Sequence, residues 1–176
     1  SKHLTSVNTT IPIIKMDWRC MDKVLFSKMD ALMCLGSSIT YFESWGEGKS
    51  IKSENRIKGL VNVLTNFKKS IKKDGKVIIG FSKHYPKNKE LEVVEFYPKM
   101  INEELLNMQW VLSLDWKRHF KTWTCDVKSQ TSDYSFKLES HLYSLEEFKS
   151  ICSFVFSEVE VYDINYDYYD LFVVCS

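Results

Sequence analysis

The sequence predicts an α/β fold on a mostly parallel sheet, with antiparallel strands inserted after its first half. Residues 29–35 (MDALMCL) and 76–81 (KVIIGF) are nearly continuous apolar runs, as in strands covered on both faces. Between them, residues 53–73 carry apolar side chains at helical spacings of three and four. Strand, helix and strand in this order imply a right-handed crossover between parallel strands.

The flanking segments complete this first half. Residues 1–10 are polar and aperiodic, which indicates a loose arm, and residues 11–16 form a short apolar strand that ends before an Asp-Trp pair. The Asp-Gly pair at 74–75 is expected to end the helix as a C-cap turn.

The pattern changes after Pro86. Residues 111–114, 119–127 and 134–138 alternate or cluster like half-exposed antiparallel strands. We therefore expect an inserted antiparallel sheet over about residues 93–140.

A short helix and a last strand pair follow. Residues 144–152 are expected to be helical, with Ser144 as N-cap and Glu147 three residues on as a capping box. Residues 155–161 and 171–175 then form a terminal antiparallel pair.

Composition narrows the class of protein. The 176 residues are 44% hydrophobic, so the chain is expected to form a single domain, residues 1–176. The formal charge of +1 gives no reason to expect nucleic acid or an anionic membrane as partner, and no apolar run reaches membrane-spanning length. Five dispersed cysteines indicate reduced thiols in a cytoplasmic protein. The basic tripeptide at 117–119 is too short to favour nucleic-acid binding.

Three stretches carry a family resemblance: MDWR at 16–19, DALMCLGSS at 30–38 and KKDGKVII at 72–79. In order and spacing they resemble the glycine and glycine/sarcosine N-methyltransferases, which are class I S-adenosylmethionine-dependent methyltransferases. The antiparallel region at 111–127 is similar to that family's inserted strands, so the resemblance spans roughly residues 11–175.

The resemblance implies a Rossmann-like methyltransferase sheet with a final antiparallel strand. It implies an enzyme that transfers a methyl group from S-adenosylmethionine to a small amine such as glycine or sarcosine, leaving S-adenosylhomocysteine. The sequence has no G-x-G-x-G stretch, and its one G-x-G, at residues 46–48, does not follow a predicted strand; it therefore matches the C-terminal two-thirds of the family, without the first strands and the glycine-rich cofactor loop. That loop is expected either upstream or from another chain; otherwise the protein is not catalytic.

By resemblance, four residues would bind the cofactor. Asp17 would accept from the adenine amino group, and Trp18 would line the ring. Backbone groups of Leu35 and Gly36 would meet the methionine end, where glycine permits close approach. The alternative is a solvated Asp17, a core Trp18 and an ordinary glycine at the end of the strand.

The acceptor residues depart from the family pattern. Ser37 replaces an amide, and Lys83 is the nearest counterpart of a carboxylate-binding arginine. By resemblance, Cys125 and His141 replace two of the family's tyrosines on the inserted strands, and Tyr97 corresponds to a tyrosine that is retained. Lysine does not reproduce the bidentate fork of arginine. Lys83 could equally lie in a surface turn, and His141 could be a half-buried strand residue. Methyl transfer is an in-line displacement that mainly requires alignment, so neither a metal site nor a catalytic residue is predicted.

Two other functions remain open. The chain could be a non-catalytic methyltransferase-like subunit that pairs with a catalytic chain, or a methyltransferase for another metabolite or an RNA base. The expected partners are a small-molecule amine and either a second copy of the chain or a partner that supplies the N-terminal part.

Overall fold

A computed structural model of the protein describes residues 17–25, 27–44, 52–81, 93–101, 104–129, 133–166 and 169–176. The strand predicted at 11–16 lies outside these residues. The elements are η1 (Trp18–Cys20), α1 (Asp22–Leu25), β1 (Met29–Cys34), η2 (Ser38–Tyr41), η3 (Ser53–Asn55), α2 (Arg56–Ser70), β2 (Ile71–Phe81), β3 (Val93–Ile101), β4 (Glu104–Asp115), β5 (Phe120–Lys128), β6 (Asp133–His141), α3 (Leu145–Val155), β7 (Val159–Tyr166) and β8 (Tyr169–Cys175).

The first sheet has the strand order β1-β2-β8-β7. β1 and β2 are parallel, and β8 is antiparallel to both of its neighbours, β2 and β7. It follows that β1, β2 and β7 run in one direction, and the last strand of the chain is inserted between two of them in the opposite direction. The parallel pair β1–β2 and the final antiparallel strand agree with the prediction, but the sheet is mixed and not mostly parallel, since one of its three described pairings is parallel and two are antiparallel.

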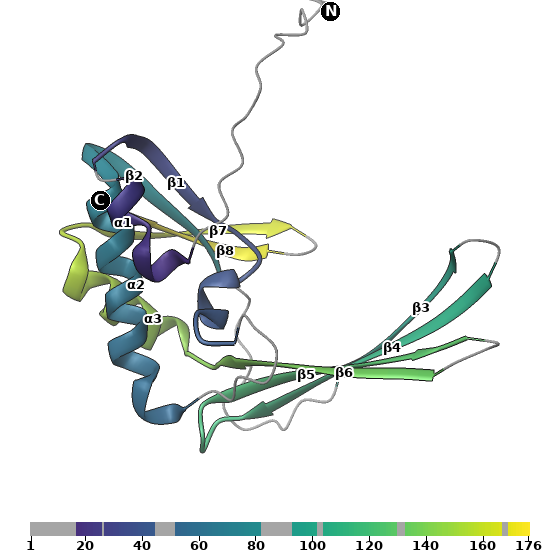
Figure 1. Cartoon of the computed structure of the whole chain (residues 1–176). Helices are drawn as coiled ribbons and strands as arrows, with labels where there is room; N and C mark the ends of the chain where they lie inside the picture. Colours follow the sequence, from purple (N-terminus) through teal and green to yellow (C-terminus); the bar gives the residue numbers. More distant parts are fainter. Residues whose placement is uncertain are drawn as a thin grey trace, which may run out of the picture.

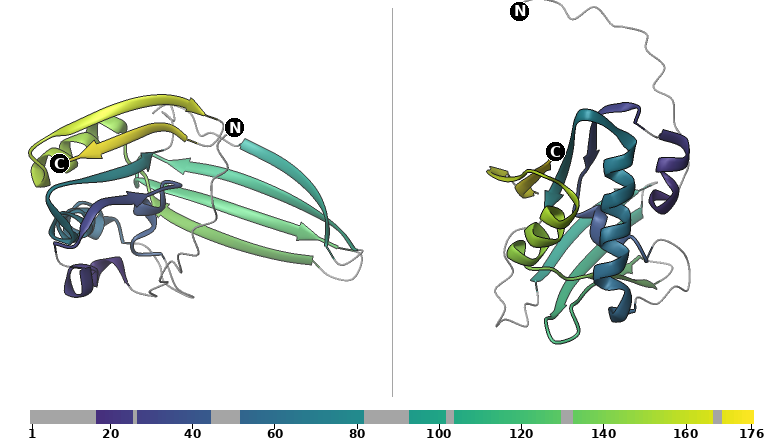
Figure 2. Two further views of the ribbon diagram at one scale, coloured as in Figure 1. Left: turned by 90° about the horizontal axis from the view of Figure 1, so that it is seen from above. Right: turned by 90° about the vertical axis from the view of Figure 1, so that its left-hand side faces the viewer.

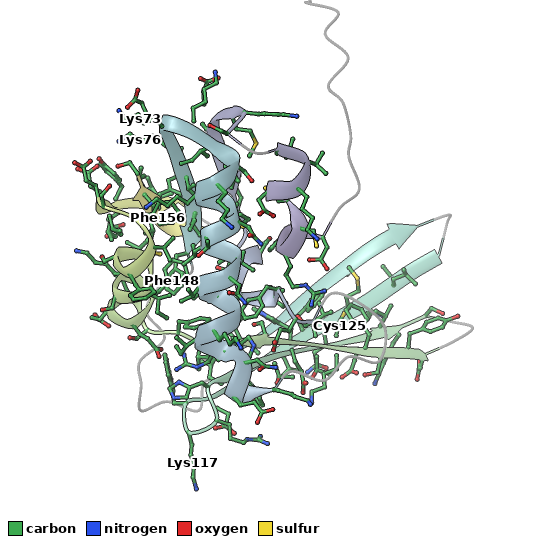
Figure 3. The ribbon with its side chains drawn as sticks, turned by 60° about the vertical axis from the view of Figure 1, so that its left-hand side comes forward. Lys73, Lys76, Lys117, Cys125, Phe148 and Phe156 are labelled. Carbon is green, nitrogen blue, oxygen red and sulfur yellow. The ribbon has the colours of Figure 1, made fainter. Side chains whose placement is uncertain are left out.

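The two long helices cover one face of this sheet (Figures 1 and 2). Four apolar side chains of α2 are fully buried, at positions 60, 63, 64 and 67, and α3 packs beside the helix with Phe148 stacked on Phe81 at a centroid distance of 4.6 Å. Figure 3 labels Phe148 on α3 and Phe156 directly after its C-terminal end; both are buried in the core. Each such side chain contributes about 1.5–3 kcal/mol by leaving water. The fully buried members of this core include Leu60, Val63, Leu64, Val77, Ile79, Phe148 and Val173.

The Asp-Gly pair does not cap α2, which corrects the sequence prediction. The helix ends at Ser70, and the chain enters β2 directly through the extended residue Ile71. Residues 72–75 form a bulge, since Met29 pairs with Ile71 but Ala31 pairs with Lys76. A Cβ on Gly75 would lie 2.9 Å from the Cβ of Ile71, so the glycine serves the bulge and not a helix end.

The α3 N-terminus agrees with its prediction. Ser144 is the N-cap, and its Oγ accepts a hydrogen bond from the backbone N–H of Glu147 at 3.1 Å. The terminal strand pair is also confirmed, although β7 begins at Val159.

The second sheet is fully antiparallel, with the order β3-β4-β5-β6, and lies between β2 and α3 in the chain. Its β3–β4 and β5–β6 ends project away from the helices (Figure 1). Its other end, formed by the β4–β5 turn and the end of β6, lies beside η2 and the start of α2. Figure 3 shows Lys117 at the tip of that turn. One face of this sheet is apolar and includes Leu112, Leu114, Trp123 and Cys125.

The buried side chain of Arg56 connects the antiparallel sheet to helices α2 and α3. Arg56, at the start of α2, is 8% exposed, and both terminal nitrogens of its guanidinium donate to the Glu147 carboxylate. Nη1 also donates to the carbonyl of Leu142 at 3.2 Å, and the Tyr143 hydroxyl donates to the Arg56 carbonyl at 2.9 Å. Burial opposes ionisation of Glu147, but the hydrogen bonds from Arg56 prevail and lower its pKa. The pair therefore joins α2, α3 and the segment after β6.

Gly59→Ala should destabilise the protein, although alanine is the better helix former. Helix propensity alone would add about 1 kcal/mol, but the new Cβ would lie 2.2 Å from Cε2 of the buried Phe42 ring. We expect a net loss of about 1–2 kcal/mol in the free energy of unfolding, measured by urea denaturation.

Lys58→Ala, at an exposed position of the same turn, should change stability by less than about 0.5 kcal/mol. In a Phe42→Leu background, Gly59→Ala should cost much less. An equal cost in both backgrounds would show that Phe42 is not the obstacle.

Candidate functional site

The turn after β1 is held in an unusual backbone conformation. Gly36 and Ser37 both have positive φ, at 70° and 52°. The Ser37 N–H donates to the carbonyl of Gly80 on β2 at 3.1 Å, and the N–H and hydroxyl of Thr40 both donate to the Ser37 carbonyl. The turn is thus fixed at the carboxyl ends of two parallel strands, where open α/β sheets bind their ligands. Leu35, at its start, is 38% exposed.

The short helix η2 leads from this turn to the end of β6. Phe42 stacks on the ring of His141 at 5.0 Å, and Glu43 Oε2 lies 3.0 Å from His141 Nε2. His141 is 1% exposed. Burial lowers its pKa, and the Glu43 carboxylate opposes this only in part. The structure therefore places His141 inside the protein, with one ring nitrogen already engaged; its predicted role toward an acceptor stays a prediction.

A buried lysine lies on the other side of η2. Lys121, on β5, is 5% exposed, and its Nζ lies 5.4 Å from the centre of the Tyr41 ring. Within the described residues, Nζ has neither a hydrogen bond nor an ion pair. Burial lowers its pKa to about 8. Burial also raises the pKa of Tyr41, and interaction with the Ser140 hydroxyl offsets this rise in part.

The segment of Asp17 and Trp18 packs along α2. The Asp17 carboxylate accepts from the backbone N–H and the guanidinium of Arg19, both at 2.9 Å, and remains about half exposed. Trp18 packs on Phe67 at a centroid distance of 6.3 Å. Hydrogen bonding to Asp17 raises the pKa of Arg19, and the Glu43 carboxylate adds to the rise, so this segment lies within electrostatic reach of η2.

The structure does not locate the side chains of two predicted acceptor residues relative to η2 and the turn before it. Lys83 lies outside the described residues, and for Tyr97 the structure gives only its position on β3, opposite Met108. The described residues contain no cluster of His, Cys, Asp and Glu that could hold a metal ion. Their cysteines are unpaired thiols. None of their helices has the length and apolarity needed to cross a membrane.

No family model and no curated protein matches this chain. Solved structures do. The amino pentose methyltransferase CalS10 of Micromonospora echinaspora, solved with SAM bound, superposes with a TM-score of 0.67 at 12% identity, over 91% of this chain and 62% of that one. DesVI of Streptomyces venezuelae gives 0.63 at 14% identity, over 92% and 63%. The sugar N-methyltransferase KedS8 of a Streptoalloteichus species gives 0.58 at 13% identity, over 84% and 56%.

These similarities show an α/β methyltransferase-like fold with mixed and antiparallel sheets. The chain spans less than two-thirds of the length of each of these structures. The predicted resemblance to methyltransferases is thus supported at the level of fold, and the narrower resemblance to the glycine N-methyltransferases is not shown by these structures.

Lys121→Met should remove a pH dependence from stability. Because the folded protein disfavours the ammonium, the unfolded chain binds more protons between pH 8 and 10.5. The free energy of unfolding should rise across this window by up to about 3 kcal/mol from this group. The variant should lose that rise and be more stable than the wild type at pH 7.

Lys128→Met, at the exposed end of the same strand, is the control and should keep the wild-type pH profile. Denaturant titrations at several pH values measure both variants. Identical profiles for wild type and Lys121→Met would show that Lys121 titrates like a solvated lysine.

Proposed function

We propose that this protein is an S-adenosylmethionine-dependent methyltransferase that acts on an amine. The observation that carries the proposal is the fixed turn of Gly36 and Ser37 at the carboxyl ends of β1 and β2, in a fold shared with a SAM-bound methyltransferase. This turn continues directly into η2, which lies beside the end of β6, where buried polar side-chain atoms lack hydrogen-bond partners. A donor bound at the turn would therefore face an acceptor held near η2.

The cofactor would contact two separate segments. Leu35 and Gly36 offer backbone groups at the strand ends, and the absence of a side chain on Gly36 leaves room for the methionine end. Asp17 is proposed to accept from the adenine amino group, with Trp18 beside the ring. Both oxygens of Asp17 accept from Arg19 in the structure, so adenine binding would require the carboxylate to share or give up one of these hydrogen bonds.

The reaction requires alignment more than acid–base chemistry. The lone pair of a neutral amine attacks the methyl carbon, the carbon–sulfur bond breaks, and S-adenosylhomocysteine leaves. An acceptor that arrives as an ammonium must lose one proton first. Holding nitrogen, carbon and sulfur in line within a dry site supplies much of the rate enhancement.

Two acceptors are compatible with this chemistry. A small amino acid such as glycine or sarcosine follows from the sequence resemblance, with Ser37, Lys83, Tyr97 and His141 as its proposed contacts. An amino sugar follows from the printed descriptions of CalS10 and KedS8. Turnover of glycine, sarcosine and an amino sugar nucleotide, compared on the same preparation, distinguishes them.

Asp17→Ala should weaken binding of S-adenosylhomocysteine by about 1–3 kcal/mol, because the amino group of the bound adenine loses its hydrogen-bond acceptor. Isothermal titration calorimetry measures the affinity. Asp30→Ala is the matched control, since Asp30 is also paired with a cation, Lys72, but lies at the start of β1, away from the strand ends that form the site. Its affinity should equal that of the wild type. No binding of S-adenosylhomocysteine by the wild type would contradict the proposed function itself.

Lys83→Ala tests the amino-acid acceptor. A lysine that neutralises the acceptor carboxylate should raise KM for glycine or sarcosine more than it lowers kcat, because it contributes equally to ground-state and transition-state binding. Steady-state kinetics give both constants. Unchanged kinetics would mean that the carboxylate is bound elsewhere or that the acceptor has none.

A further inference from the structure

The inner end of the antiparallel sheet gathers polar atoms that lack partners. Within the described residues, four buried side-chain atoms have no hydrogen-bond partner: Trp116 Nε1, His119 Nδ1, Ser140 Oγ and His141 Nδ1. All belong to the β4–β5 turn or to the end of β6, and so lie at one corner of the molecule. Buried polar groups are normally satisfied by protein, water or ligand. By strand register Ser140 lies on the same face as Lys121 and His141 on the opposite face, so Ser140 Oγ is the unpartnered atom that could act together with this lysine.

Lys121 is the one charged group on the apolar face at this corner. In the strand register it lies between Leu114 on β4 and Ser140 on β6. Trp123 and Cys125 follow it on the same face of β5. Among the described side chains of β4, β5 and β6, this face carries no other charge. A buried ammonium among apolar side chains carries a large desolvation free energy unless an opposite charge lies nearby.

The position of Lys121 connects it to the proposed methyl donor. Its Nζ lies over the ring of Tyr41, the last residue of η2, and η2 begins two residues after Gly36. Contact with an aromatic face favours the protonated amine. At pH 7 a lysine with a pKa of about 8 is still protonated by about ten to one. At neutral pH Lys121 is therefore a cation and not a free base, and only the short helix η2 separates it from the turn of Gly36 and Ser37.

We propose that Lys121, with the hydroxyl of Ser140, binds an anionic oxygen group of the methyl acceptor. The group is a carboxylate if the acceptor is an amino acid, and a phosphate if it is a sugar nucleotide. In a water-poor corner, a charge-assisted hydrogen bond to such a group is stronger than in solution. Lysine binds it as a point charge, so Ser140 would add the direction that the ammonium lacks. This inference rests on the proposed function, because it names how the same site holds its acceptor.

The pKa of Lys121 measured by NMR tests this directly. In protein with 13C-labelled lysines, the Lys121 signal is identified by its loss in Lys121→Met. Its pKa is then measured in chloride, inorganic phosphate or acetate at equal ionic strength, with and without S-adenosylhomocysteine. One of the two oxyanions should raise the pKa of Lys121 by at least one pH unit and saturate, and the responsive anion identifies the acceptor group. Lys128 should not respond beyond the chloride control.

The outcomes separate the two proposals. No saturable rise with either oxyanion, or an equal rise at Lys128, overturns the anion site even if S-adenosylhomocysteine binds. A rise without any binding of S-adenosylhomocysteine supports the anion site while contradicting the proposed function. Ser140→Ala should reduce the affinity for the responsive anion several-fold and leave the fold intact; an unchanged affinity removes Ser140 and the paired site from the proposal. Lys121→Met is expected to fold, because methionine retains the apolar stem in an apolar setting.

Discussion

The buried pair of Arg56 and Glu147 is the contact on which the rest of this arrangement depends. It is the point where the first helix of the crossover, the helix after the antiparallel sheet, and the end of β6 are joined. Breaking one partner of such a pair leaves a charge buried without compensation, which costs far more than a surface ion pair is worth. The pair thus fixes the antiparallel sheet against the helices at one end, while the other end of the sheet projects away from them.

A second constraint brings the two sheets into chemical contact. The positive-φ turn at Gly36 and Ser37 directs the chain from β1 into η2, and η2 with the two residues after it contacts β5 and β6. Tyr41 lies toward Lys121 on one face, whereas Phe42 and Glu43 reach His141. The close approach of Phe42 to Gly59 sets the position of η2 against α2. One short helix therefore links the strand ends, where a donor would bind, to the polar corner.

Much of the fold follows from the sequence, because burial leaves a clear periodicity. The continuous apolar runs of β1 and β2 and the spacing of α2 predict the parallel pair and its crossover. The helix end predicted at the Asp-Gly pair is wrong, because the same two residues suit both a helix end and a bulge. The two structures are distinguished only by the approach of Met29 and Ile71 to Gly75. Such long-range contacts leave no local signal.

The acceptor side was harder to predict for the same reason. Alternation along β5 places Lys121 on the side of Trp123 and Cys125, so a lysine at an apolar register position could have been noticed. That it lacks a counter-charge depends on residues far away in the sequence, on η2 and β6. The sequence predicts a role for His141, but its partner Glu43 lies 98 residues away and belongs to no motif.

The central claim is that the strand-end turn and the corner beside η2 form one methyl-transfer site. A crystal structure with S-adenosylhomocysteine tests it most directly. The claim predicts the homocysteine portion against Leu35 and Gly36, the adenine toward Asp17 and Trp18, and the sulfur directed to η2. Ligand bound on another surface of the protein, away from the carboxyl ends of β1 and β2, would contradict it.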